Sequence, residues 1–168
     1  MIISCMKDLY RIHVVCLGNI ARSPAAEYML QHYMDLEQKN RNSSISVEVS
    51  SSGTNGGMYT EMEPLSEEYL RENGIVPKGF QSRRATRGIL ENQDIILLME
   101  RYMIQNLWDL APNKKYITFK EAAGESGNVR DPYGDSKPEY YQVMKLIDDC
   151  SKKIAQRFYD GKLIDLEG

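Results

Sequence analysis

A cysteine followed six residues later by an arginine is the feature of this sequence that best suits chemistry. Cys16 ends a short apolar stretch, residues 12–16, and Arg22 immediately precedes a Ser23-Pro24 pair. A thiolate is a strong nucleophile, and a guanidinium can bind two oxygens of one phosphate group at the same time. This pair of residue types therefore points to phosphoryl transfer through a covalent intermediate.

The segment between these two residues favours a tight anion-binding loop. It consists of Leu17, Gly18, Asn19, Ile20 and Ala21. Gly18 and Asn19 tolerate unusual backbone dihedral angles, so a loop this short can curl and turn successive N–H groups inward. Those groups would lie at the positive end of the following helix, which favours a bound phosphate and the thiolate form of Cys16. The structural alternative is a buried cysteine at a strand end beside a surface arginine.

Strands that alternate with helices must position this loop. Hydrophobic patterning predicts strands at 11–16, 46–50, 94–99 and 115–119, helices at 23–37, 64–73, 101–110 and 138–159, and loops at 51–58 and 124–135. Serine at the N-cap and proline at the first helical position mark the helix start at Ser23-Pro24. The alternation predicts an α/β fold, a three-layer sandwich whose central parallel sheet of about four strands has helices on both faces. We expect a single domain over residues 1–168, with residues 1–11 as an N-terminal extension.

Composition and charge argue against several classes of protein. The chain has 21 basic and 24 acidic residues, so the strong basic excess typical of general nucleic-acid binders is absent. No apolar run approaches the ~18–20 residues that cross a bilayer. The three cysteines, Cys5, Cys16 and Cys150, include no C-x-x-C pair, which favours a reducing, cytoplasmic setting. We therefore expect no nucleic-acid or membrane partner and, by default, a monomer; His13 and His32 are interpreted as structural.

A resemblance to a known family makes the chemistry more specific. Residues 16–24, Cys-Leu-Gly-Asn-Ile-Ala-Arg-Ser-Pro, resemble the phosphate-binding loop V-C-x-G-N-x-C-R-S-P of the low-molecular-weight protein tyrosine phosphatases. Further matches follow along the chain: 51–54 to an S-A-G-T turn, 72–75 to a helix end, 82–84 to A-R-Q, 96–100 to a core strand ending in M-D, and 131–133 to a D-P-Y acid loop. The resemblance leaves only about the first eleven residues uncovered.

The resemblance implies hydrolysis of phosphotyrosine in proteins, with tyrosine-phosphorylated proteins as the partners. Cys16 would attack the phosphorus and form a cysteinyl phosphate, while Arg22 and the loop N–H groups bind the phosphate. Asp131 would protonate the leaving phenolate and then deprotonate the incoming water. No metal or other cofactor is expected, because the arginine and the amides neutralise the charge. The structural alternative for Asp131 is an ordinary turn opener.

Supporting roles are implied for several further residues. Ser23 would hydrogen-bond the Cys16 sulfur and help it leave, or act only as a helix N-cap. Asn19 and Ser51 would bond to each other and hold the shape of the loop, or reflect turn propensity alone. The substrate cleft would be lined by Ile20, Tyr59 and Tyr133, of which Tyr133 could instead be a solvated loop tyrosine.

The sequence departs from the family pattern at four places. Ala21 replaces a cysteine that normally protects the nucleophile by forming a reversible disulfide. Phe80 stands at about the place of a histidine that supports the Asn–Ser pair. Residues 55–58, Asn-Gly-Gly-Met, lack the aromatic usually found after the S-A-G-T turn, although Tyr59 could substitute. Gly134 stands where a second tyrosine of D-P-Y-Y would be.

Two other functions remain as alternatives. Gly134 resembles the D-P-F-G of protein-arginine phosphatases of the same fold, but those enzymes carry threonine where this chain has Ile20, which suits a phenyl ring. A non-catalytic phosphate-binding module would keep the loop without turnover, and the presence of Cys16, Arg22 and Asp131 argues against it. Arsenate reductases share the fold but need a further cysteine pair, and no cysteine lies between Cys16 and Cys150.

Overall fold

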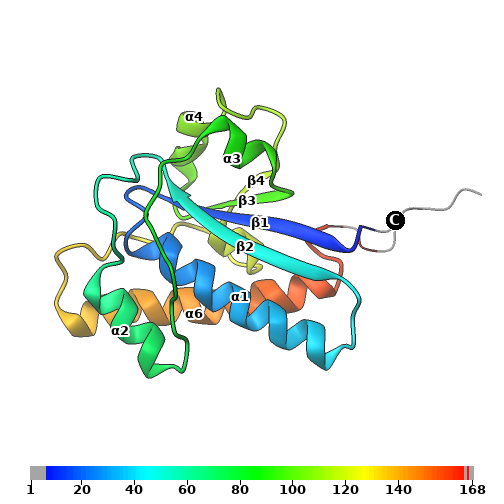
Figure 1. Ribbon diagram of the computed structural model, residues 1–168, viewed down its shortest axis with the longest axis horizontal. Helices are drawn as coiled ribbons and strands as arrows, with labels where there is room; N and C mark the ends of the chain where they lie inside the picture. The colour runs from blue at the N-terminus through cyan, green and yellow to red at the C-terminus, as the bar shows by residue number, and fades with distance from the viewer. Residues whose placement is uncertain (1–6, 165, 167–168) are drawn as a thin grey trace, which may run out of the picture.

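A four-stranded parallel sheet forms the centre of the computed structural model, which describes residues 7–164 and residue 166. The strand order is β2–β1–β3–β4 (Figure 1). The strands are β1 (Leu9–Cys16), β2 (Ser46–Gly53), β3 (Ile95–Leu98) and β4 (Tyr116–Thr118). The predicted α/β sandwich with about four parallel strands is confirmed.

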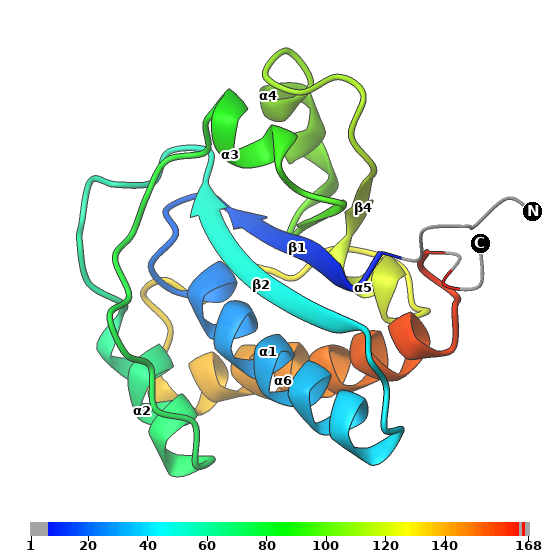
Figure 2. The ribbon, with the colours of Figure 1, turned by 45° about the vertical axis from the view of Figure 1, so that its right-hand side comes forward.

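Helices cover both faces of this sheet (Figures 1 and 2). The two long helices, α1 (Arg22–Asn40) and α6 (Lys137–Tyr159), pack side by side across one face, and α2 (Pro64–Glu72) packs against both of them. The other face carries α3 (Arg87–Glu91), the 3₁₀ turn η1 (Arg101–Met103) and α4 (Ile104–Leu107), while α5 (Phe119–Ala122) follows β4 directly. In the described part of the chain, no helix is long and apolar enough to cross a membrane.

Several predicted boundaries are wrong, and each has a physical reason. Strand β1 begins at Leu9, so the end of the expected N-terminal extension belongs to the sheet, because Leu9 pairs with Ser46; residues 1–6 of that extension lie outside the described residues. Strand β2 continues to Gly53, into the predicted loop, because its last residues still pair with β1. The helix predicted at 101–110 is a 3₁₀ turn followed by the short helix α4.

Two short helices, α3 and α5, were not predicted. Each is too short to show a periodic pattern of apolar residues. Thr118 begins α5 with a capping box, in which its hydroxyl accepts from the Glu121 N–H and the Glu121 side chain accepts from the Thr118 N–H. The Thr118–Glu121 pair identifies this helix start in the sequence only once β4 is known to end at Thr118.

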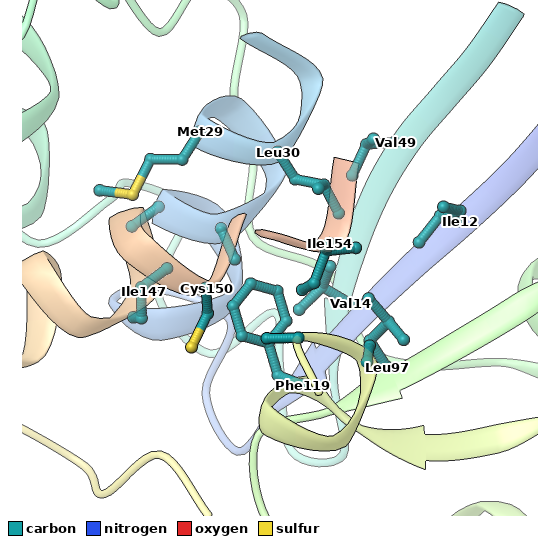
Figure 3. Close-up of a cluster of buried hydrophobic side chains, with 14 of the residues drawn as sticks. Ile12, Val14, Met29, Leu30, Val49, Leu97, Phe119, Ile147, Cys150 and Ile154 are labelled. Atoms are coloured by element: carbon teal, nitrogen blue, oxygen red, sulfur yellow. The ribbon is translucent and has the colours of Figure 1, made fainter. Parts of the chain in front are cut away.

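Side chains of β1 alternate between two hydrophobic cores. Ile12 and Val14 face α1 and α6, whereas Val15 packs with Leu90 and Leu98 on the opposite side. Figure 3 shows the larger core, in which these labelled side chains meet: Ile12, Val14, Met29, Leu30, Val49, Leu97, Phe119, Ile147, Cys150 and Ile154. Burying a side chain of this size stabilises the fold by about 1.5–3 kcal/mol.

Two residues with reactive side chains are part of this packing. Cys150 lies in the larger core, where burial raises the pKa of its thiol to about 11. His13 is fully buried in β1, with its two ring nitrogens 2.7 and 2.6 Å from the hydroxyls of Ser50 and Ser52. Burial lowers the pKa of His13 to about 3, with a smaller effect of the Arg83 guanidinium, so the ring is neutral. Both side chains therefore belong to the packed interior of the domain.

Candidate active site

The loop between β1 and α1 closes around the sulfur of Cys16. The N–H of Asn19 donates to Sγ at 3.3 Å, and the hydroxyl oxygen of Ser23 lies 2.9 Å from Sγ. Asn19 has a φ of 53°, in the left-handed region that asparagine tolerates better than most residues. The predicted curl of this short loop is therefore present, and it aims donors at the cysteine.

Ser23 does not cap the helix. Helix α1 begins at Arg22, Ala21 occupies the N-cap position, and no side chain caps the end. The Ser23 hydroxyl instead accepts from the side-chain amide of Asn19 at 2.8 Å and lies against the Cys16 sulfur, with the Ser52 carbonyl as a more distant acceptor at 3.4 Å. The N-cap interpretation is wrong, because the helix starts one residue earlier and the hydroxyl is already engaged.

Asn19 holds the loop through all of its side-chain groups. Its Nδ2 donates to the hydroxyls of Ser23 and Ser51, at 2.8 and 2.9 Å. Its Oδ1 accepts from the backbone N–H of Arg83 at 3.0 Å. Because every donor and acceptor of this buried amide is used, the left-handed conformation of Asn19 is fixed by its surroundings. The expected Asn19–Ser51 bond is present.

Strand β2 approaches the loop so closely that only glycine fits at one position. A Cβ added to Gly53 would lie 2.5 Å from the carbonyl oxygen of Leu17. The backbone N–H groups of Thr54 and Asn55 donate to the carbonyls of Cys16 and Leu17, both at 2.9 Å. The sequence 51–54 therefore supports the loop through backbone contacts, which explains why a glycine stands there.

Arg22 is buried and anchored from three directions. Only 2% of its side chain is exposed. Its Nη1 donates to Oε1 of Glu100 at 2.5 Å and to the carbonyl of Val129 at 2.8 Å. Its Nη2 lies 3.5 Å from Oδ2 of Asp131. A buried cation needs such partners to offset its lost hydration, and these hold the guanidinium plane beside the loop.

Glu100 is a site residue that the sequence reasoning did not select. It follows β3 at the carboxyl edge of the sheet, where parallel strands bring their following residues together. The sequence did offer one signal for Glu100: residues 96–100, which end in Glu100, match a core strand of the family that ends in M-D. The partnership with Arg22 depends on the sheet order, in which β1 and β3 are neighbours.

Asp131 begins a turn and also faces Arg22. Its Oδ1 accepts from the backbone N–H of Tyr133 at 3.1 Å, while Oδ2 points toward Arg22. The carboxyl group is 42% exposed, so an incoming group can reach it. The two interpretations of Asp131 are therefore compatible, because each uses a different oxygen.

A cavity of about 200 Å³ lies above the loop. It is lined by Cys16, Leu17, Gly18, Ile20, Ala21, Arg22, Glu63, Asp131 and Tyr133. An adjoining hollow of about 380 Å³ shares Ile20, Glu63 and Tyr133 with it and adds Tyr59. Of the three residues expected in the cleft, Ile20 and Tyr133 therefore border the cavity itself, whereas Tyr59 borders only the outer hollow. Tyr59 and Tyr133 are 66% and 71% exposed, so both form a rim rather than a closed wall.

The segment from Phe80 to Arg83 supports the loop from outside. The Ser82 hydroxyl donates to the carbonyl of Gly18 at 3.1 Å, and Nε of Arg83 donates to the carbonyl of Ser51 at 2.9 Å. Phe80 makes no polar contact; its ring packs edge-on against Tyr28, with 6.5 Å between ring centroids. Among the described residues, no group of three or more His, Cys, Asp or Glu is placed to hold a metal ion.

Comparison with known proteins agrees with this geometry. A family model described as low molecular weight phosphotyrosine protein phosphatase matches residues 11–162. The low molecular weight protein-tyrosine-phosphatase Wzb of Escherichia coli K12 is 30% identical over 147 residues, which cover 86% of this chain and 92% of that protein.

Solved structures are similar over nearly the same length. The YwlE arginine phosphatase, solved with a phosphorylated active-site serine, has a TM-score of 0.80 and 28% identity, covering 94% of this chain and 99% of that one. Wzb of Vibrio vulnificus, in complex with benzylphosphonate, has a TM-score of 0.74 and 27% identity, covering 88% of this chain and 98% of that one. From its loop geometry and from these matches, this chain belongs to the low molecular weight phosphotyrosine protein phosphatase family.

Proposed function

We propose that this chain, acting as one phosphatase domain, hydrolyses phosphotyrosine in proteins through a cysteinyl phosphate on Cys16. The observation that carries the proposal is that Cys16, Arg22 and Asp131 line the same cavity of about 200 Å³. A nucleophile, a cation for the phosphate oxygens and an acid for the leaving group are the three requirements of this reaction.

In the first step the phosphoryl group moves from the phenol to the sulfur. The substrate phosphate takes the place of the Asp131 carboxyl at the Arg22 guanidinium, where the two side chains now lie 3.5 Å apart. The Cys16 thiolate attacks the phosphorus, an S–P bond forms, and the P–O bond to the phenol breaks. Asp131, in its protonated form, gives its proton to the departing phenolate oxygen. Arg22 and the loop N–H groups hold the charge on the other phosphate oxygens.

In the second step water removes the phosphoryl group. Asp131, now ionised, accepts a proton from the water as the water oxygen attacks the phosphorus. The S–P bond breaks, inorganic phosphate leaves, and the thiolate is restored. The Ser23 hydroxyl, 2.9 Å from Sγ, donates to the sulfur as negative charge returns to it.

The lining of the cavity favours an aromatic substrate. Ile20 presents an apolar surface beside the phosphate position, and Tyr133 borders the same cavity. A phenyl ring gains by contact with such side chains, whereas Ile20 offers a guanidino group no hydrogen bond and leaves it only the polar residues of the same lining, such as Glu63 and Asp131. Tyr59 lies farther out, where it can contact residues that flank the phosphorylated side chain.

Phosphoarginine is a second candidate substrate. Gly134, with a φ of 81°, follows Tyr133 as in the D-P-F-G pattern of the arginine phosphatases. The similarity to the YwlE arginine phosphatase extends over 94% of the chain. Ile20, which offers no hydroxyl, is the observation that favours phosphotyrosine over this candidate.

A direct comparison of two substrates tests the proposal. Peptides of one sequence carrying either phosphotyrosine or phosphoarginine are offered to the wild type and to Cys16→Ser. We expect the wild type to have the higher kcat/KM on phosphotyrosine and Cys16→Ser to release no phosphate from either peptide. A higher kcat/KM on phosphoarginine would establish the second candidate. Equal release by the wild type and Cys16→Ser would exclude both enzymes and leave a phosphate-binding module.

The proposal also covers where and how the protein works. We expect a cytoplasmic monomer that needs no metal and binds neither nucleic acid nor membranes. The formal net charge of −3 supports it, as do Cys16 and Cys150, which are both free thiols. Sedimentation at several protein concentrations checks the oligomeric state, and activity in the presence of a strong metal chelator checks the metal.

A further inference from the structure

Two hollows lead away from the active-site cavity along the segment that joins β2 to α2. The outer hollow, of about 380 Å³, shares Ile20, Glu63 and Tyr133 with the cavity. A third hollow, of about 260 Å³, shares Glu61 and Met62 with the outer hollow. The backbone N–H of Glu63 donates to the carbonyl of Ile20 at 2.8 Å and holds this segment beside the phosphate-binding loop. A peptide whose phosphotyrosine enters the cavity can therefore continue along the two hollows.

Carboxylates border both hollows, and among the described residues no lysine or arginine does. Glu61 borders both of them, and Glu63 borders the outer hollow and the cavity. Glu67, which borders the third hollow, pairs with Arg71 at 2.8 Å. In the part of the chain that the structure describes, neither Glu61 nor Glu63 forms such an ion pair. Their negative charges therefore remain available to a ligand.

A neutral donor fixes Glu63 in place. The Tyr140 hydroxyl donates to Oε2 of Glu63 at 2.6 Å and lies 2.6 Å from the Ser66 hydroxyl. Burial, and after it the hydrogen bond to Glu63, raises the pKa of Tyr140, so the phenol keeps its proton at physiological pH. The contact holds the Glu63 carboxylate at the boundary between the cavity and the outer hollow without cancelling its charge.

The same lining offers aromatic rings to a cation. Tyr59 borders the outer hollow, Tyr133 borders both the outer hollow and the cavity, and both side chains are largely exposed. An arginine guanidinium stacks on such rings and binds a carboxylate through two N–H groups, so it suits this surface better than the compact ammonium of lysine. An acidic residue in the same place would meet two like charges.

We propose that Glu61 and Glu63 are specificity-determining residues, which select phosphotyrosine that has arginine on one flank and reject phosphotyrosine that has acidic residues there. The two carboxylates attract the arginine and repel the acidic residue, so both effects widen the same difference. The inference rests on the proposed function, because it names which phosphotyrosine peptides the same cavity accepts. The net charge of −3 alone would favour basic peptides on either flank, whereas the two hollows extend from the cavity along one segment.

Four peptides with a central phosphotyrosine test the proposal. Two carry a pair of arginines, either before or after the phosphotyrosine, and the other two carry a pair of glutamates at the same positions. On one flank we expect kcat/KM of the wild type for the arginine peptide to exceed that for the glutamate peptide about 5–30-fold, because each exposed ion pair contributes about 1.5–5-fold and each like-charge contact subtracts a similar factor. On the other flank the ratio should stay below about 2-fold, and sodium chloride at about 0.5 M should reduce the larger ratio.

Two variants and a matched control assign this ratio to residues. Glu61→Gln and Glu63→Gln should each lower it about 2–5-fold. Glu61 is exposed, so the result of Glu61→Gln does not depend on the Tyr140 contact that Glu63→Gln alters. Glu91→Gln removes the same charge from an exposed position on α3 that borders neither hollow, and it should keep the wild-type ratio. Equal ratios on the two flanks, or an equal loss in Glu91→Gln, would overturn the inference.

Binding to Cys16→Ser separates this inference from the proposed function. The dissociation constants of the four peptides, measured by calorimetry, should show the same preference for arginine on the same flank without any turnover. If the wild type releases no phosphate from any peptide but this preference is present, the proposed function fails and the recognition of arginine stands. If the wild type hydrolyses all four peptides at similar rates and Cys16→Ser binds them equally, the recognition fails and the proposed function stands.

Discussion

The hydroxyl oxygen of Ser23 lies 2.9 Å from the sulfur of Cys16, although helix α1 already begins one residue before that serine. A serine in front of a proline usually satisfies backbone N–H groups at a helix start. Here the hydroxyl is held by Asn19 and turned to the nucleophile instead. The same residue thus shows how the fold can redirect a side chain from a local structural role to a chemical one.

Replacing Ser23 with alanine should slow the second step of the reaction. The sulfur leaves as an anion when the cysteinyl phosphate is hydrolysed, and Ser23→Ala removes a hydrogen bond to that charge, worth about 1.5–3 kcal/mol or roughly 10–100-fold in rate. Rapid mixing with an aryl phosphate should show a burst of phenol close to one per enzyme, followed by slow turnover. Loss of the burst itself, with the steady state unaffected, would contradict this role.

Replacing Asp131 with asparagine should make the rate depend strongly on the leaving group. A phenol of high pKa needs a proton as it departs, and loss of a general acid costs about 10²–10⁴-fold. We expect a loss of that order on phenyl phosphate and a much smaller loss on dinitrophenyl phosphate. Asp135→Asn is the control in the same loop, where Asp135 pairs with Arg130. An equal loss on both substrates would argue that Asp131 only shapes the loop.

Peroxide should inactivate this protein irreversibly. Ala21 borders the cavity with Cys16 and occupies the position of the usual protecting cysteine, so a sulfenic acid on Cys16 meets no thiol at that position and should proceed to sulfinic acid. After long exposure to peroxide, thiol treatment should restore little activity to the wild type and most of it to Ala21→Cys. Complete recovery of the wild type would refute this. Added inorganic phosphate should slow inactivation of both, because it would compete with peroxide for access to Cys16.

Replacing Glu27 with glutamine should stabilise the fold more at pH 8 than at pH 5. The pKa of Glu27 is raised from 4.5 to about 7 by burial. Its contribution to the free energy of unfolding is therefore fully present below pH 4.5 and is lost as the pH rises through 7. Urea titrations of the wild type and Glu27→Gln at both pH values measure the difference. A constant difference between wild type and Glu27→Gln at the two pH values would show that the Glu27 carboxyl does not titrate in this range.

The sequence by itself determined the fold class and the centre of the site. Cys16 and Arg22 are separated by only five residues between a strand and a helix, so the short loop keeps them close together in any fold of the chain. The alternation of apolar strands and amphipathic helices likewise admits few arrangements other than a covered parallel sheet.

Only the tertiary structure decided which groups surround that centre. Glu100 reaches Arg22 because β3 lies beside β1, and Asp131 approaches the same guanidinium from a loop far along the chain. Glu27 meets the loop only through Ser51, which β2 brings alongside. These partnerships depend on sheet order and register, which long-range packing sets and no local pattern encodes. The same packing, rather than propensity, gave Ser23 its place beside the sulfur.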